Sequence, residues 1–277
     1  MQNVTREHDL SVLRARIAAI EKRPLLAEAA RPVPAGRRED EDWQALLSLP
    51  AGLLHEVYAD EQRNGGAALG FALGLGKGLL TPERPALLYL HLVHEGQELG
   101  LPYGAGLMSF GMDPGSLILG RMQTLTELLW AVEEAIACRA VAGVVADVAG
   151  APKGLDFTAS RRLSLRAAGG GASVFMLRYG RAREATAARL RWAIRPVASQ
   201  SPPADDRAPG PPRWQVTLEK GRLGPAAGSG AMQFVVEWTE NGFAPIAPGK
   251  DRSRVFPGAA PYGAPPAPLG DGLSQTG

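Results

Sequence analysis

The sequence is poor in the features that mark secreted, membrane-spanning and disulfide-bonded proteins. Its 277 residues include one cysteine, Cys138, which excludes an internal disulfide framework and a multi-cysteine zinc site. No apolar run reaches the ~18 residues needed to span a bilayer, and the first ten residues lack the apolar region of a secretory signal. We therefore expect a cytoplasmic protein with no membrane partner, in which Cys138 is a core residue of a helix.

Short motifs of several enzyme classes are also missing. The sequence contains no G-x-S-x-G elbow, no Cys and His at a recognisable catalytic spacing, and no G-x-G-x-x-G after a strand. The sequence therefore lacks the usual signatures of serine hydrolases, cysteine hydrolases and dinucleotide-binding enzymes.

Residues 52–80 have the strand, loop and helix of a phosphate-binding loop without its phosphate-binding side chains. A working loop reads GxxxxGK[ST], in which the lysine contacts the phosphates and the hydroxyl binds Mg²⁺. Here Gly66 stands at the lysine position and Ala67 at the hydroxyl position, while Asp60 and Glu61 add negative charge. The degenerate nucleotide loop consists of Asp60, Glu61, Gly65, Gly66 and Ala67. The pattern predicts a nucleotidase scaffold that has lost phosphoryl transfer, with room only for weak anion binding by backbone N–H groups.

The central part of the chain alternates between strand and helix patterns. We expect strands over 52–59, 85–92, 116–120, 141–147 and 172–177, and helices over 66–79, 103–111, 124–136 and 157–168. Thr124 and Glu127 form a capping-box pattern at the start of one helix. Buried strands that alternate with helices predict a doubly wound, mostly parallel α/β sheet.

The pattern changes after residue 188. A further strand over 188–197 is followed by alternating segments at 213–220 and 232–238, which predict antiparallel strands at the edge of the sheet. We divide the chain into an N-terminal helix and linker (1–48), a core (49–200), C-terminal antiparallel strands that complete the domain (201–243) and a disordered Pro/Gly-rich tail (244–277).

Two groups of polar residues are candidates for a metal or acid–base site. Asp147 ends the buried strand 141–147, where a Walker B carboxylate would hold Mg²⁺, but an acid at a strand end is also a common turn residue. His91 and His94 lie close to Glu95 and Glu98, although no H-E-x-x-H motif is present and solvated loop residues are the alternative. We expect no metal and no cofactor.

Charge is distributed unevenly although the whole chain carries only +2. Residues 51–150 have five cations against eleven acids, and residues 151–200 have ten cations against two acids, a net +8. Nine of those ten cations are arginine, the side chain suited to bidentate phosphate contacts. The cluster indicates either a solvated basic face or a surface for nucleic acid or an acidic protein.

The order of these elements resembles the RecA-like core, and several segments together resemble the ImuA family of SOS-response proteins. The matching segments are Leu13–Glu21, Gly52–Val57, Tyr103–Leu107, Gly111–Pro114, Leu128–Ala135, Leu155–Leu163, Arg213–Trp214 and Glu237–Trp238. The resemblance covers roughly residues 10 to 242 and implies a RecA-like sheet. In active RecA relatives the loop carries Gly-Lys-Thr, so the resemblance does not carry ATPase activity to this chain, and Asp147 is a Walker B remnant.

The resemblance also implies a damage-inducible, non-catalytic adaptor of error-prone translesion DNA synthesis. Its implied partners are an ImuB-type polymerase-like protein, an error-prone C-family DNA polymerase and RecA, with single-stranded DNA as a further candidate ligand. Loops around the later strands of the RecA fold contact single-stranded DNA. The candidate DNA- or partner-binding residues are therefore Arg161, Arg162, Arg178, Arg181, Arg183, Arg189 and Arg191. The alternatives are an unusual ATPase of the RecA superfamily and a cell-division inhibitor like SulA.

Overall fold

The computed structural model describes residues 49–94, 100–150, 152–202, 205, 208–223 and 232–246. The strands are β1 (Leu54–Ala59), β2 (Ala86–Leu92), β3 (Leu117–Met122), β4 (Val141–Asp147), β5 (Ser173–Tyr179), β6 (Leu190–Val197), β7 (Arg213–Lys220), β8 (Met232–Thr239) and β9 (Gly242–Pro245). The helices are α3 (Gly65–Lys77), α5 (Gly104–Ser109), α6 (Leu125–Ala137) and α7 (Phe157–Gly170), with short 3-10 turns η1 (Gln62–Asn64) and η2 (Pro114–Ser116).

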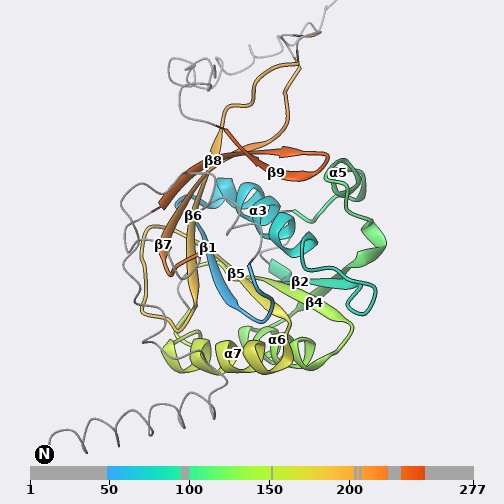
Figure 1. Cartoon of the computed structure of the whole chain (residues 1–277). Helices are drawn as coiled ribbons and strands as arrows, with labels where there is room; N and C mark the ends of the chain where they lie inside the picture. The colour runs from blue at the N-terminus through green and yellow to red at the C-terminus, as the bar shows by residue number, and fades with distance from the viewer. Residues whose placement is uncertain are drawn as a thin grey trace, which may run out of the picture.

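All of these strands belong to one sheet, in the order β3-β2-β4-β5-β1-β6-β7-β8-β9 (Figure 1). The strands from β3 to β6 run parallel, and β7, β8 and β9 continue the sheet antiparallel. This arrangement confirms the predicted α/β class with a parallel core and antiparallel C-terminal strands. Within the parallel part of the sheet, Asp147 on β4 is paired in register with His91 on β2, and Arg178 on β5 is paired with Tyr58 on β1.

Each face of the sheet is covered by different helices. Helix α3 lies on one face, and α6 and α7 lie on the other (Figure 1). The α3 face has an aromatic core in which the Phe71 ring lies 5.7 Å from Trp192 and 5.4 Å from Phe243. The opposite core is aliphatic and contains the fully buried Leu128 and Leu163. Each such side chain contributes about 1.5–3 kcal/mol through burial.

The two helices on the aliphatic face begin at side-chain caps. Thr124 Oγ1 accepts a hydrogen bond from the Glu127 N–H at 3.2 Å, as the capping-box pattern predicts. Asp156 caps α7 by accepting from the Ala159 N–H at 2.8 Å. Helix α7 ends at Gly171, which has a φ of 77° and so takes the left-handed conformation that favours glycine.

Two details differ from the sequence-based expectations. Strand β9 was not predicted, because its four residues lie where the Pro/Gly-rich composition begins. Cys138 is exposed at the C-terminal cap of α6 and is not a core residue. Among the described residues, no helix has the length and apolar character that crossing a membrane requires. The predicted N-terminal helix and linker (1–48) and nearly all of the tail lie outside the described residues.

Candidate functional site

The degenerate loop folds into a short turn that uses its own backbone donors. After β1 the chain forms η1, in which the Asn64 N–H donates to the Glu61 carbonyl at 3.0 Å. The Gly65 N–H donates to the Gln62 carbonyl. In a phosphate-binding loop, such N–H groups face the phosphates. Two donors at the start of α3 are thus already satisfied within the loop.

A tyrosine from β5 packs onto the start of α3. A Cβ atom placed on Gly65 would lie 3.2 Å from Cε1 of Tyr179, so the phenol ring is in direct contact with this end of the helix. The Tyr179 hydroxyl then donates to Oδ1 of Asp147 at 2.8 Å. Tyr179 therefore lies between the loop and the carboxylate that were predicted to form a nucleotide site.

Asp147 is held by two tyrosines at the end of β4. Its Oδ2 atom accepts from the Tyr89 hydroxyl at 2.7 Å, so each carboxylate oxygen has a hydroxyl partner. Asp147 is 2 % exposed. Burial raises its pKa above the usual value, and the hydrogen bonds from Tyr89 and Tyr179 offset only part of this shift. A Walker B carboxylate needs oxygen atoms open to hydrated Mg²⁺, and this donor set does not fit that role.

The two histidines of the predicted polar cluster differ in burial. His91 is buried in β2, with Nδ1 at 3.0 Å from the Leu92 carbonyl, and its Nε2 has no hydrogen-bond partner within the described part of the chain. His94 is exposed, and Glu95 and Glu98 lie outside the described residues. Among the residues that the structure describes, no group of His, Cys, Asp or Glu is arranged to hold a metal ion.

The acids of the degenerate loop are paired with arginines. Asp60 accepts from Arg183 at 2.9 Å and from Arg195 at 2.7 Å, while Glu61 pairs with Arg63. Desolvation acts to raise the pKa of Asp60, but the hydrogen bonds from Arg195 and Arg183 outweigh it and hold that pKa below its usual value. The negative charge of the loop is thus balanced within the protein.

Three of the seven candidate arginines surround a single buried ring. The guanidinium groups of Arg183, Arg191 and Arg178 lie 4.1, 5.5 and 5.8 Å from the ring centre of Tyr58. Cation–π contacts of this kind are favourable by roughly 0.5–2 kcal/mol. We call Tyr58, Arg178, Arg183 and Arg191 the Tyr58 cluster.

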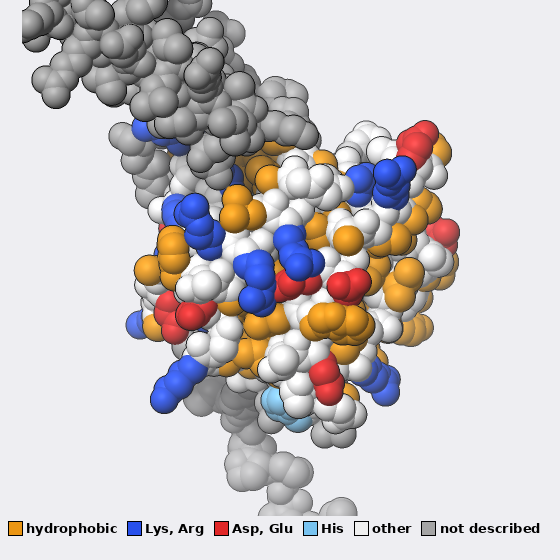
Figure 2. All heavy atoms as spheres, turned by 90° about the horizontal axis from the view of Figure 1, so that it is seen from below, with side chains coloured by type: hydrophobic (Ala, Val, Ile, Leu, Met, Phe, Trp, Pro, Cys, Tyr) orange, Lys and Arg blue, Asp and Glu red, His pale blue; other side chains and the backbone are white. Residues whose placement is uncertain are grey.

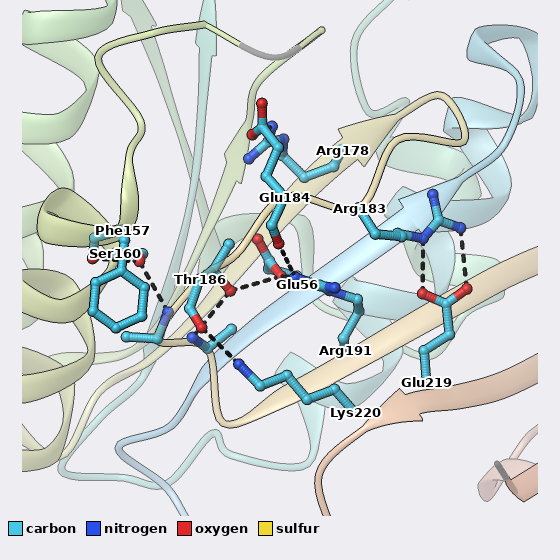
Figure 3. Close-up of polar contacts among 12 residues, drawn as sticks. Glu56, Phe157, Ser160, Arg178, Arg183, Glu184, Thr186, Arg191, Glu219 and Lys220 are labelled. Atoms are coloured by element: carbon cyan, nitrogen blue, oxygen red, sulfur yellow. Dashed lines mark hydrogen bonds and ion pairs between the residues drawn. The ribbon is translucent and has the colours of Figure 1, made fainter.

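Each arginine of the Tyr58 cluster also has a carboxylate partner (Figure 3). Arg178 donates to Glu184 at 2.9 Å and Arg191 donates to Glu56 at 2.9 Å. Arg183 contacts both Asp60 and Glu219. The side chain of Arg178 is only 2 % exposed, and its Nε and Nη1 atoms have no partner among the described residues. The charges of these arginines are thus paired with acids within the protein.

The remaining candidates divide into one paired and three exposed arginines. Arg162 on α7 pairs with Glu133 on α6, and Figure 2, which looks onto the α6–α7 side, shows blue and red side chains next to each other. Arg161, Arg181 and Arg189 are exposed, and none of them has a carboxylate within ion-pair distance among the described residues.

Arg181 borders an open polar cavity of about 570 Å³ beside β6 and β7. Its lining also includes Asp60, Arg183, Arg195, Thr217 and Glu219. The structure does not bring the seven predicted arginines onto one surface.

No sequence motif points to Tyr58, Tyr89 or Tyr179 as residues of this region. Tyr58 and Tyr179 share one signal, which is position: they lie in the last two residues of β1 and β5, at the edge where parallel strands end. Tyr89 lies in the middle of β2 and has no such signal. An aromatic residue placed there can fill a crevice that a ligand would otherwise occupy.

Comparison with known proteins identifies the family. No protein-family model matches this sequence. Protein ImuA from Caulobacter vibrioides, in strains NA1000 and CB 15, is 35% identical over 192 residues, which cover 65% of this chain and 74% of the relative. With this identity over about three quarters of the relative's length, the chain belongs to the ImuA family.

Proposed function

We propose that this protein is a non-catalytic RecA-like adaptor in SOS-induced, error-prone translesion DNA synthesis. Membership of the ImuA family supports the pathway. One structural observation supports the non-catalytic role: Tyr179 packs on the start of α3 and, with Tyr89, occupies both oxygens of Asp147. The loop supplies no lysine and no hydroxyl for phosphoryl transfer. The proposed partners are an ImuB-type polymerase-like protein, an error-prone C-family polymerase and RecA.

Co-purification tests the adaptor role. We expect the tagged full-length chain to retain the ImuB-type protein from its host, equally with and without ATP, and Asp147→Asn to leave this retention unchanged because no nucleotide step is involved. ATP hydrolysis that disappears in Asp147→Asn would contradict the proposal and support the ATPase alternative. Retention of the cell-division GTPase in place of the ImuB-type protein would support the SulA-like alternative.

We further propose that single-stranded DNA is contacted by Arg161, Arg181 and Arg189. These are the candidate arginines that are exposed and lack a carboxylate partner among the described residues. A protein that neutralises phosphates loses affinity as the salt concentration rises. On a single strand, the slope of the logarithm of the binding constant against the logarithm of the salt concentration becomes steeper by about 0.7 for each phosphate contact. Arg178, Arg183 and Arg191 are less suited because their charges are already balanced by acids.

Replacing these three arginines by alanine tests the DNA contact. We expect weaker binding to single-stranded DNA and a salt slope reduced by about 2, measured by fluorescence anisotropy at several salt concentrations. The matched control replaces Arg121, Arg139 and Arg222, which are exposed outside the basic segment, and removes the same net charge. Equal effects of the two triple variants would show a general charge effect and would refute a specific contact.

A further inference from the structure

A second concave surface lies between α3 and α5 and reaches the start of α3 at Gly66. Its volume is about 220 Å³. We call it the α3–α5 groove, lined chiefly by Gly66, Leu69, Leu73, Lys77, Leu107 and Trp238. The glycines of α3 make room for it, because a Cβ atom on Gly66 would meet nothing within 4 Å. The groove is therefore open where α3 begins.

Large apolar side chains are exposed on and beside the α5 segment that lines the groove. Tyr103, which lines the groove, is 76 % exposed, and Met108 and Leu101, the sequence neighbours of the lining residues Leu107 and Pro102, are 61 % and 38 % exposed. Single exposed apolar residues are ordinary, but a group of them beside an apolar cavity marks an interaction site. Aromatic residues and methionine are also enriched where proteins meet.

Lys77 gives the groove an uncompensated positive charge. Its ammonium lies 5.4 Å from the ring centre of Trp238 and donates to the Phe110 carbonyl at 3.2 Å. No carboxylate of the described residues lies within ion-pair distance of it. The Trp238 indole N–H is buried and has no acceptor among the described residues. The groove thus combines apolar walls with one charged donor, Lys77, that favours an oxygen acceptor.

We propose that the α3–α5 groove binds a peptide segment of a partner protein, with one bulky apolar side chain in the groove and an adjacent carboxylate on Lys77. The inference deepens the proposed adaptor function by naming a partner-binding surface. Charge complementarity selects the carboxylate, because Lys77 is the one charged residue among the residues that line the cavity. The carboxylate can belong to an acidic side chain or to the C-terminus of the partner.

A small ligand with the same chemistry provides the direct test. N-acetyl-L-phenylalanine carries an aromatic side chain beside a carboxylate, and at its size we expect a Kd on the order of 1 mM. NMR titration of the full-length chain would measure it. N-acetyl-phenylalanine amide, which lacks the charge, should bind about 3–10 times more weakly. N-acetyl-Phe-Asp-amide distinguishes the sources: binding as tight as that of the free acid indicates an acidic side chain, and weaker binding indicates a C-terminus.

Gly66→Leu is the decisive variant. Its Cβ atom would meet nothing within 4 Å at the mouth of the groove, and the change removes a glycine from a helix, so the fold should be retained. We expect at least tenfold weaker binding of N-acetyl-phenylalanine. The matched control is Gly169→Leu, on α7, where a Cβ atom also meets nothing within 4 Å. Lys77→Gln should remove the preference for the free acid over the amide.

The outcomes separate this proposal from the adaptor function. If N-acetyl-phenylalanine does not bind the wild-type chain, or binds Gly66→Leu equally well, the proposal that the α3–α5 groove binds a peptide is wrong. Binding that Gly66→Leu abolishes supports the groove even if no ImuB-type protein co-purifies, and in that case only the adaptor proposal fails. Loss of the co-purified partner in Gly66→Leu but not in Gly169→Leu would support both.

Discussion

Acidification from pH 7 to pH 4 should destabilise this protein because the unfolded chain then binds a proton at His55 that the folded protein does not, and His55→Gln should remove most of that sensitivity. His55 is buried in β1, where Nδ1 accepts a hydrogen bond from Trp192 Nε1 at 3.3 Å and the ring stacks on Phe175 at 4.6 Å. Burial lowers the pKa of His55 from 6.5 to about 3. The imidazole therefore stays neutral in the folded protein at a pH where the unfolded chain binds a proton.

The sign of this effect follows from proton linkage. Between pH 6.5 and pH 3 the unfolded state binds more protons at His55 than the folded state does, so the free energy of unfolding falls as the pH falls. One pKa unit corresponds to about 1.4 kcal/mol, which gives a loss of roughly 3 kcal/mol by pH 4. The stabilisation is fully present above pH 6.5.

Urea denaturation at pH 7, 5.5 and 4 measures the effect. The quantity to compare is the slope of the unfolding free energy against pH, because His55→Gln also changes packing at every pH. His94→Gln is the matched control, since His94 is exposed. An identical pH slope for the wild type and His55→Gln would show that other groups cause the acid sensitivity.

Glu56→Ala should destabilise the protein by about 3–5 kcal/mol, because it leaves the buried Arg191 without its carboxylate. Glu56 and Arg191 have side chains that are 4 % and 11 % exposed and lie 2.9 Å apart. The Thr186 hydroxyl also donates to Glu56 at 2.9 Å. Removing the acid leaves both the guanidinium and the hydroxyl without that acceptor.

Glu219→Ala is the control for Glu56→Ala. Glu219 pairs with Arg183, which keeps Asp60 as a partner, so the expected loss is under about 1 kcal/mol. The double variant Glu56→Leu with Arg191→Leu should recover much of the stability, since replacing both partners removes the unpaired charge. Equal midpoints of urea denaturation for Glu56→Ala and Glu219→Ala would contradict a structural role for the Tyr58 cluster.

The sheet could be predicted from the sequence because its signals are local. The β-branched run of Val141–Asp147 and the Thr124–Glu127 cap indicate a strand and a helix without knowledge of any distant residue. The alternation of such elements then leaves few possible topologies. The short strand β9 has no comparable signal.

The partners of the arginines could not be predicted because they lie far away along the chain. Glu56 and Arg191 are 135 residues apart, and Asp60 and Arg183 are 123 residues apart. Strand β1 comes from the acidic segment and lies between β5 and β6, which come from the basic one. Part of the charge imbalance seen in the sequence is therefore balanced by ion pairs between the two segments in the folded protein. The missing lysine of the loop was visible in the sequence, but the tyrosines that occupy its surroundings were not.

The central position of β1 also has a consequence for synthesis. Both of its neighbours in the sheet, β5 and β6, are translated more than a hundred residues later. At roughly 5–20 residues per second, β1 waits on the order of ten seconds before it can pair. Its apolar residues remain uncovered by their final partners during that time. A chain that stops before Leu190 has one open edge at β1 and lacks the arginine that neutralises Glu56.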